Sequence, residues 1–291
     1  MSATEVVADG LVFAEGLRWH EGALWFSDMH GRCVYRLEIG GEPEVIATID
    51  DRPSGLGFLA DGRPLVVSMV DRRLLAIEDG GLAEYADLSS LAPWHCNDMH
   101  VDPQGRAYVG NFGDGAEYPD VPGPTVLILV EADGTARVVA EDLCYPNGID
   151  LTADGGTLIV AETCAAPGRL TAFAVAADGS LSDRRTLVSF AGPGFPDARD
   201  GGGSPDGIAI DAEGGIWVAF PLGDEVLQVT PDGQIDRRVA VDNPFSVALG
   251  GADRRDLFIC TAPSWLPDEA LANRAGSIRR LRVDVPGQLA N

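Results

Sequence analysis

Three oxygen-bearing side chains, Glu15, Asn147 and Asp206, each open a short cassette in which apolar residues follow at the same spacing. Six such cassettes occur along the chain: Glu15-Gly-Leu-Arg-Trp19, Ser54-Gly-Leu-Gly-Phe58, Asn97-Asp-Met-His-Val101, Asn147-Gly-Ile-Asp-Leu151, Asp206-Gly-Ile-Ala-Ile210 and Phe245-Ser-Val-Ala-Leu249. Two carboxylates and an amide suit a hard cation such as calcium or manganese. Zinc is compatible with them, although it more often recruits His or Cys. If the repeats close into a ring, the leading residues meet on its axis, and the sequence predicts one divalent cation there, with calcium favoured.

Other polar residues near these positions have more than one interpretation. Asn97 leads its own cassette and is either a fourth, looser ligand or a hydrogen-bond donor to substrate. Asp98 ligates, orients Asn97 or hydrogen-bonds the backbone between neighbouring blades. His95 is a candidate general base or oxyanion donor, against the alternative of a packing or exposed histidine. Glu117, in a long loop, is a candidate substrate contact or a solvated acid. His100 is assigned to packing between blades.

The cassettes belong to an internal repeat, and such repeats decide the architecture of a chain. Each apolar stretch is followed by a tight turn that ends in glycine: His20-Glu-Gly22, Ala60-Asp-Gly62, Asp102-Pro-Gln-Gly105, Thr152-Ala-Asp-Gly155 and Asp211-Ala-Glu-Gly214. Strongly β-prone stretches come next: Ala23–Ser27, Pro64–Ser68, Ala107–Gly110, Thr157–Ala161, Ile216–Phe220 and Asp256–Cys260. Turns of this kind between apolar runs are strong hairpin signals.

Third and fourth strands complete the pattern. The third strands are Cys33–Leu37, Arg73–Ile77, Thr125–Leu129, Arg169–Phe173, Glu225–Val229 and Ser277–Leu281, and weaker, more polar fourth strands include Pro43–Ala47 and Arg137–Ala140. Four strands repeated six times predict an all-β, six-bladed propeller that occupies residues 1–291 as one domain. The sixth repeat lacks a fourth strand, and Thr4–Ala8 is expected to supply it and close the ring.

The loops select one face of this propeller. The longest insertions, Asn111–Asp120, Ala191–Ser204 and Ala262–Asp268, fall in connections that share the face where the leading residues begin their strands. Long loops on a rigid scaffold are where binding surfaces usually form. We therefore expect the site at this end of the axis.

Composition excludes several classes of function. The formal net charge of −24 disfavours nucleic acid and anionic membrane surfaces as partners. The five cysteines are scattered, which argues against a disulfide framework or a zinc–thiolate site. The first residues lack the pattern of a signal peptide, and no apolar run has the length of a membrane helix, so a cytoplasmic protein is expected. The sequence makes no prediction of the oligomeric state.

Five segments together resemble the SMP-30/gluconolactonase/luciferin-regenerating-enzyme family: Glu15–Trp19, Asn97–Arg106, Pro146–Gly148, Pro205–Ala219 and Leu249–Asp253. The resemblance implies a six-bladed propeller that holds one divalent cation and hydrolyses sugar lactones or related cyclic esters. It implies that Glu15, Asn147 and Asp206 bind the metal, that Asn97 contacts substrate, and that Asp206 is also the catalytic base. Members that act on sugar lactones often carry arginine two residues before that asparagine, where this chain has His95, so a less polar lactone or another ester is an alternative substrate.

The hypothesis from sequence is therefore a metal-dependent lactonase whose partner is a small-molecule lactone. A water held near Asp206 would attack a carbonyl polarised by the cation. Phosphotriester hydrolysis at the same site is one alternative, and a non-catalytic, ligand-binding propeller with a structural cation is another. The sequence contains neither a Gly-x-Ser-x-Gly elbow nor a phosphate-binding loop, which disfavours serine hydrolases and kinases.

Overall fold

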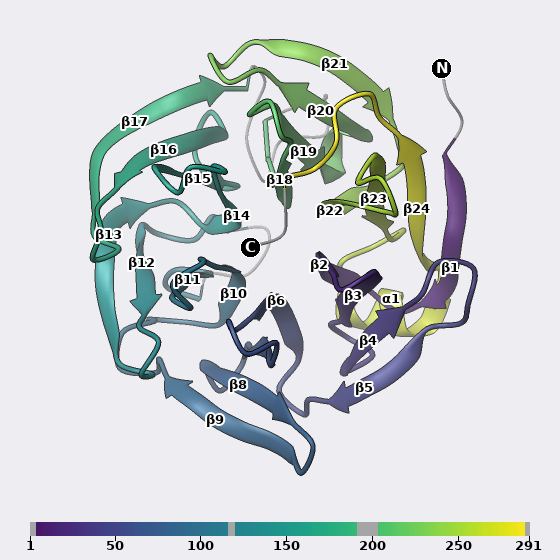
Figure 1. Ribbon diagram of the computed structural model, residues 1–291, viewed down its shortest axis with the longest axis horizontal. Coiled ribbons are helices and arrows are strands. Elements are labelled where there is room, and N and C mark those ends of the chain that lie inside the picture. The colour runs from purple at the N-terminus through teal and green to yellow at the C-terminus, as the bar shows by residue number, and fades with distance from the viewer. Residues whose placement is uncertain (1–3, 116–119, 191–202, 289–291) are drawn as a thin grey trace.

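Six four-stranded antiparallel sheets are arranged as blades around a central axis in the computed structural model, which describes residues 4–115, 120–190 and 203–288 (Figure 1). The innermost strands are β2 (Ala14–His20), β6 (Pro53–Phe58), β10 (Cys96–Val101), β14 (Pro146–Leu151), β18 (Ile208–Ile210) and β22 (Pro244–Gly250). The second strands are β3 (Ala23–Asp28), β7 (Pro64–Ser68), β11 (Ala107–Asn111), β15 (Thr157–Glu162), β19 (Ile216–Phe220) and β23 (Asp256–Thr261). The predicted six-bladed propeller is confirmed.

The outer half of each blade follows the same order. The third strands are β4 (Cys33–Leu37), β8 (Arg73–Glu78), β12 (Thr125–Val130), β16 (Arg169–Val175), β20 (Glu225–Val229) and β24 (Gly276–Arg282). The outermost strands are β5 (Glu44–Thr48), β9 (Gly81–Asp87), β13 (Ala136–Leu143), β17 (Leu181–Ser189), β21 (Ile235–Ala240) and β1 (Glu5–Leu11). The N-terminal strand β1 pairs with β24, so the predicted closure of the ring is confirmed.

Two short helical segments interrupt the strands. One is a 3-10 turn at Pro221–Gly223, and the other is helix α1 (Pro267–Asn273), which lies between β23 and β24. Helix α1 was not predicted, because seven residues are too few to show a helical period. No helix in the described ranges has the length and hydrophobicity needed to span a bilayer.

The backbone conformation of the predicted hairpin turns explains why they contain glycine. Gly22, Gly62, Gly105, Gly155 and Gly214 all have φ between 69° and 85°, in the region that residues with a side chain rarely adopt. The tight turns expected from the sequence therefore form at the expected residues.

A second set of glycines lets the inner strands approach one another. A Cβ atom on Gly55 would lie 2.5 Å from the backbone nitrogen of Met99, and one on Gly148 would lie 2.5 Å from the backbone oxygen of Asp206. Both contacts are shorter than any ordinary packing distance, so a side chain would force neighbouring blades apart. The glycine that follows several leading residues is thus a condition for bringing those residues together on the axis.

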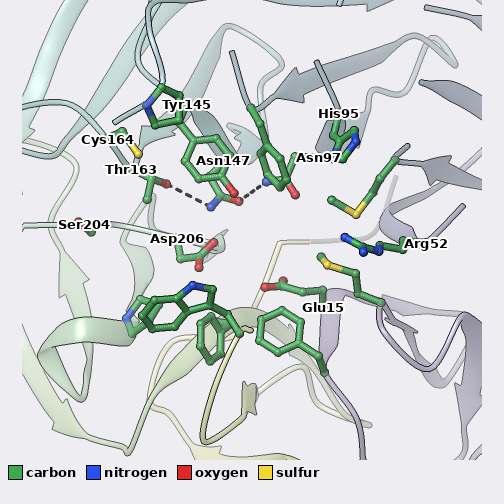
Figure 2. Close-up of a pocket in the computed structure, with 18 of the residues that line it drawn as sticks. Glu15, Arg52, His95, Asn97, Tyr145, Asn147, Thr163, Cys164, Ser204 and Asp206 are labelled. Atoms are coloured by element: carbon green, nitrogen blue, oxygen red, sulfur yellow. Dashed lines mark hydrogen bonds between the residues drawn. The ribbon is translucent and has the colours of Figure 1, made fainter. Parts of the chain in front are cut away.

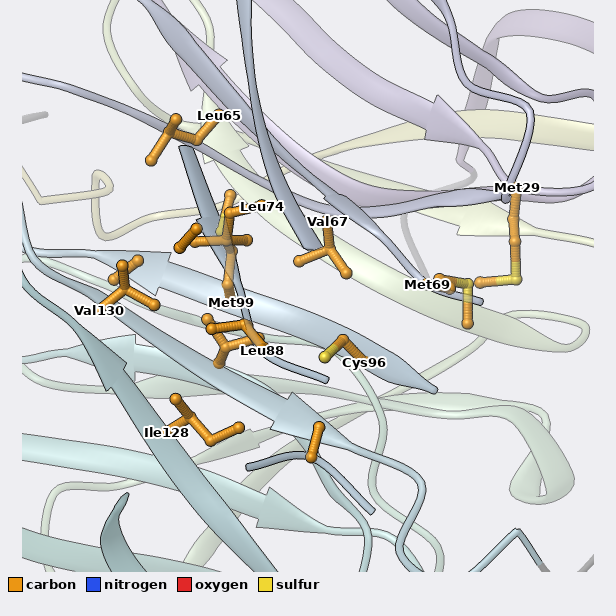
Figure 3. Packing of buried hydrophobic residues seen from close by; sticks show 14 of the residues in the cluster. Met29, Leu65, Val67, Met69, Leu74, Leu88, Cys96, Met99, Ile128 and Val130 are labelled. Carbon is orange, nitrogen blue, oxygen red and sulfur yellow. The ribbon is translucent and has the colours of Figure 1, made fainter. Parts of the chain in front are cut away.

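Buried side chains fill the spaces between blades. The largest cluster includes Leu65, Val67 and Leu74 of one blade and Met99 and Ile128 of the next (Figure 3). All five are no more than 1% exposed. The apolar alternation of the repeat therefore produces closely packed clusters between the blades, which give the inner strands a rigid support.

A buried carboxylate fixes the turn that leads into β14. Glu162 is fully buried, and Arg169 donates to its two oxygens at 2.9 and 2.8 Å. Thr171 donates to Oε1 at 2.5 Å, and the backbone N–H of Cys144 donates to Oε2 at 2.9 Å. Burial raises the pKa of Glu162, but the hydrogen bonds from Arg169, Thr171 and Cys144 outweigh it, so the pKa lies below its ordinary value.

We expect Glu162→Gln to lower the free energy of unfolding at pH 7 by about 2–4 kcal/mol, because it leaves partly buried guanidinium groups without their carboxylate. Because its pKa is lowered in the folded state, ionised Glu162 stabilises the fold at pH values above about 4.3, the pKa of a glutamate in the unfolded chain. This stabilisation is lost as the pH falls through the folded-state pKa. The difference from wild type, measured by urea unfolding, should therefore shrink at pH 3.5.

Glu225→Gln is the matched control, since Glu225 pairs with Arg238, whose side chain is 58% exposed. Such exposed pairs contribute about 0–1 kcal/mol. Equal unfolding midpoints for the two variants at pH 7 would contradict the role given to Glu162.

Candidate active site

Five of the residues singled out from the sequence line a single cavity of about 450 Å³ at one end of the axis (Figure 2). They are Glu15, His95, Asn97, Asn147 and Asp206. The sixth candidate, Glu117, lies outside the described residues. The insertion Ala262–Asp268 contributes Trp265, Leu266 and Pro267 to the wall, as expected for loops on this face.

Strand irregularities direct the leading residues toward the axis. Pairing between the first and second strands slips just after Glu15, near Ser54, after Cys96 and after Pro146. Such bulges re-aim side chains that would otherwise alternate across the sheet. Asp206 differs, because it lies two residues before β18, where its N–H donates to the carbonyl oxygen of Ala219 at 2.9 Å.

Hydrogen bonds lock the two asparagine amides in a chain that crosses several blades. Ser54 Oγ donates to Asn97 Oδ1 at 3.1 Å, and Asn97 Nδ2 donates to Asn147 Oδ1 at 2.8 Å. Asn147 Nδ2 donates to Thr163 Oγ1 at 3.1 Å, and that hydroxyl donates to the carbonyl oxygen of Pro205 at 2.7 Å. Both amides therefore have fixed orientations, although the sequence alone gave no sign of the Ser54 and Thr163 contacts.

The two carboxylates of the cavity lack a cationic partner among the described residues. Burial raises the pKa of Glu15 well above its ordinary value, and the nearby carboxyls of Asp206 and Asp98 add to the effect. Burial also raises the pKa of Asp206, with Asp98 as the next cause, while a hydrogen bond from Asn147 partly offsets it. Ionising both acids therefore costs free energy unless a positive charge is supplied to the cavity.

These donors fit a divalent cation. Glu15 and Asp206 supply two carboxylates, and Asn147 Oδ1 accepts one hydrogen bond and has a second lone pair. A bound cation would favour the ionised form of both carboxyls and so oppose the effect of burial on their pKa values. No cluster of three or more His, Cys, Asp or Glu with metal-binding geometry occurs in the described part of the chain, so the donor set depends on the amide as well as on the acids.

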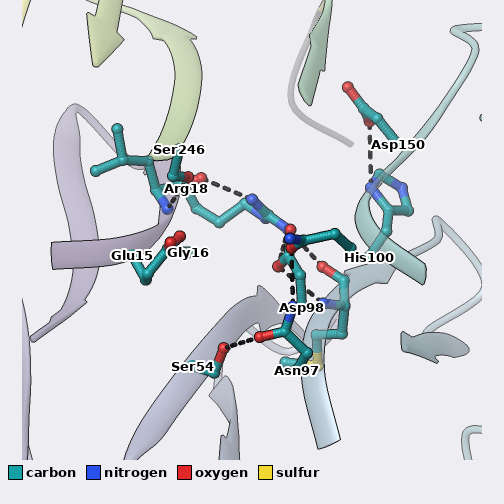
Figure 4. Close-up of polar contacts among 12 residues, drawn as sticks. Glu15, Gly16, Arg18, Ser54, Asn97, Asp98, His100, Asp150 and Ser246 are labelled. Carbon is teal, nitrogen blue, oxygen red and sulfur yellow. Dashed lines mark hydrogen bonds and ion pairs between the residues drawn. The ribbon is translucent and has the colours of Figure 1, made fainter. Parts of the chain in front are cut away.

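Asp98 has a structural contact that the sequence left open. Its Oδ1 accepts the N–H of Met99 at 2.8 Å and Arg18 Nη2 at 3.1 Å, and the same Arg18 nitrogen donates to the carbonyl oxygen of Met99 (Figure 4). Asp98 does not line the cavity. Of the three interpretations, the structure shows the contact between blades, which ties β2 to β10 near the site.

The two histidines of this region have separate locations. His95 lines the cavity and stacks against Trp94, with ring centroids 4.8 Å apart. His100 Nδ1 lies 3.2 Å from Asp150 Oδ1, and both residues line a second cavity of about 190 Å³ at the other end of the inner strands. His100 therefore links neighbouring blades, as the sequence indicated.

Several residues that line the cavity were not among the site residues predicted from the sequence. Arg52 and Tyr145 each stand two positions before a leading residue, and both adopt positive φ, at 64° and 53°. His95 has the same relation to Asn97, so a fixed spacing of two residues was available as a signal. Trp265 lines the cavity too, but nothing in its local sequence distinguishes it from an ordinary loop residue.

Comparison with known proteins gives matches over most of the chain. The sequence pattern of the SMP-30/Gluconolactonase/LRE-like region matches residues 13–263. A 6-deoxy-6-sulfogluconolactonase of Pseudomonas putida is 33% identical over 196 residues, which are 66% of this chain and 62% of that protein. The pentonolactonase XacC of Haloferax volcanii is 29% identical over 99% of this chain and 97% of its own length.

Solved structures agree with the propeller architecture. The crystal structure of a calcium-binding protein, regucalcin, from Agrobacterium tumefaciens superposes with a TM-score of 0.80. It is 24% identical, and the match covers 98% of this chain and 95% of that one. At this identity the likeness shows the shared fold.

Proposed function

This chain belongs to the SMP-30/gluconolactonase/LRE-like family, and we propose that it is a hydrolase that opens lactone rings in the cavity around Asp206. One observation carries the proposal: oxygen donors from three blades line one cavity, the Asn147 amide is held by hydrogen bonds, and the two acids form no ion pair among the described residues. Relatives named as sulfogluconolactonase and pentonolactonase support lactones as the substrate class.

The proposed cofactor is one divalent cation held by Glu15, Asn147 and Asp206. Oxygen donors and the name of the calcium-binding fold relative favour calcium. When bound, such a cation supplies Lewis-acid polarisation of the lactone carbonyl and stabilises the negative charge that develops on its oxygen.

The remaining chemistry belongs to residues of the chain. The carboxylate of Asp206 accepts a proton from the water whose oxygen attacks the carbonyl carbon. The bond between that carbon and the ring oxygen then breaks, and the proton passes to the leaving alkoxide, so that the product is a hydroxy acid. Asn97, locked by Ser54 and Asn147, uses its second Nδ2 hydrogen to hold the substrate. His95, on the adjoining wall, contacts the substrate as well.

A pH-indicator assay on a substrate panel tests the proposal. We expect the best lactone among aldonolactones and aliphatic lactones to be hydrolysed with kcat/KM of about 10⁴ M⁻¹s⁻¹ or more. Phosphotriesters should be slower by a factor on the order of 10² or more, because the trigonal carbonyl and the tetrahedral phosphorus need different placements of the attacked atom. Faster turnover of phosphotriesters, or none of any lactone with cation present, would overturn the assignment.

A further inference from the structure

A second ring of side chains borders the cavity, and each member stands two positions before a leading residue. We name this the minus-two ring; its members are Phe13, Arg52, His95, Tyr145, Ser204 and Asn243. All except Asn243 line the cavity. Three leading residues supply the proposed cation ligands. The side chains of the minus-two ring are placed to contact the parts of a substrate that lie away from the cation.

Arg52 is the one arginine or lysine among the cavity-lining residues that the structure describes. Its backbone is fixed just before β6, because its φ is 64° and its carbonyl oxygen accepts the N–H of Met69 at 3.0 Å. Its side chain points into the cavity across from Asp206 (Figure 2). Members of the family that act on sugar lactones often carry arginine where this chain has His95, and this chain has an arginine at the same ring position of the preceding blade.

The Arg52 guanidinium is not paired with either acid of the cavity in the described residues. It forms no ion pair within the described ranges, and the largest charge effects on the pKa of Glu15 come from Asp206 and Asp98, followed by Arg18. Arg52 is half-buried beside an apolar wall that includes Met29 and Met69. A guanidinium in such surroundings gains most from a bound anion, which it contacts through two parallel N–H groups.

The other titratable groups that line the cavity do not pair with Arg52 in the described residues. Burial lowers the pKa of His30 and the charge of Arg52 lowers it further, while a hydrogen bond to the carbonyl oxygen of Trp265 and the charge of Asp28 oppose the shift. Glu15 and Asp206 are the two acids that line the cavity, and Asp98 pairs with Arg18 outside it. A divalent cation that offsets these two carboxylates would leave the Arg52 guanidinium available to a bound anion.

We propose that Arg52 is a specificity-determining residue that binds an anionic substituent, such as a carboxylate, sulfonate or phosphate, on the lactone ring. This proposal rests on the proposed function for the reaction, and it assigns a substrate class: lactones that carry a fixed negative charge away from the carbonyl. The anion lies against Arg52 while the carbonyl faces Asp206 across the cavity.

Matched substrates test this assignment. The wild type, Arg52→Gln and Arg52→Lys are assayed with a neutral aldonolactone and with lactones of the same ring that carry a carboxylate, sulfonate or phosphate. We expect the wild type to prefer the anionic lactones, and Arg52→Gln to lower the ratio of kcat/KM for anionic over neutral lactone by about 10- to 100-fold, mainly through KM. Arg52→Lys should recover part of the ratio. Arg32→Gln is the control, because Arg32 also has positive φ (59°) but is exposed and does not line the cavity.

A binding experiment separates this inference from the lactonase assignment. Calorimetric titration of the cation-loaded protein uses a non-hydrolysable cyclic ether with the preferred anionic group and its neutral counterpart. Tighter binding of the anionic ether by wild type than by Arg52→Gln supports the anchor even if no lactone is hydrolysed. Hydrolysis of lactones with the same charge preference in both proteins, together with equal ether binding, would overturn the role of Arg52 and leave the lactonase intact.

Discussion

Asp206→Asn is expected to lower kcat/KM for lactone hydrolysis by a factor on the order of 10³ or more. The substitution keeps the size of the side chain, but it removes both the proton acceptor and a negatively charged ligand of the proposed cation. Initial rates with the best lactone, at saturating cation, measure the effect. Activity within tenfold of wild type would mean that Asp206 is neither base nor ligand.

The Asp206 variant should fold without difficulty. Burial, followed by the charge of Asp98, raises the pKa of Asp206 well above its ordinary value. Because the pKa is raised in the folded state, ionisation of Asp206 destabilises the fold as the pH rises through the folded-state pKa. The Asp206→Asn variant, which has a neutral amide, should therefore be at least as stable as wild type in cation-free buffer at pH 8. Asp150→Asn is the matched control: Asp150 lies at the far end of an inner strand, and wild-type activity is expected.

Glu15→Gln is expected to weaken binding of a divalent cation by a factor on the order of 10² or more, because it removes one of two charged ligands. Calorimetric titration of chelator-treated protein with Ca²⁺ and Mn²⁺ measures the affinity, and hydrolysis at low cation concentration should fall in parallel.

Ser54→Ala is the control for that experiment. Ser54 occupies the same position of its own cassette, but its side chain is uncharged and donates a hydrogen bond to Asn97. It should keep the cation affinity of wild type while lowering turnover, since Asn97 loses part of its support. Equal cation affinity in wild type and Glu15→Gln would remove Glu15 from the ligand set.

The fold was predictable because each repeat contains local signals for its turns and strands. Turn glycines such as Gly62 and Gly155 mark hairpins, and the apolar runs that flank them mark strands. A single register then follows for every blade, so Glu15, Asn147 and Asp206 could be placed in one cavity although they lie far apart in sequence. Helix α1 gave no such signal, because it occurs once and is short.

The less predictable features depend on contacts between distant residues. Asp98 was ambiguous because its partner, Arg18, comes from another blade and has no fixed spacing from it. Arg52 was not predicted, because its cassette begins with Ser54, whose short uncharged side chain does not mark a ligand position. The phase of the repeat nevertheless encodes that position, as His95 and Tyr145 show.

The central claim is that Glu15, Asn147 and Asp206 hold one divalent cation on which lactone hydrolysis depends. The most direct measurement strips the wild-type protein with a chelator and then titrates a cation back while binding and hydrolysis of the best lactone are both recorded. We predict that hydrolysis is lost on stripping and returns in proportion to occupancy of a single site. Full hydrolysis by the stripped protein, or recovery unrelated to occupancy of one site, would contradict the account.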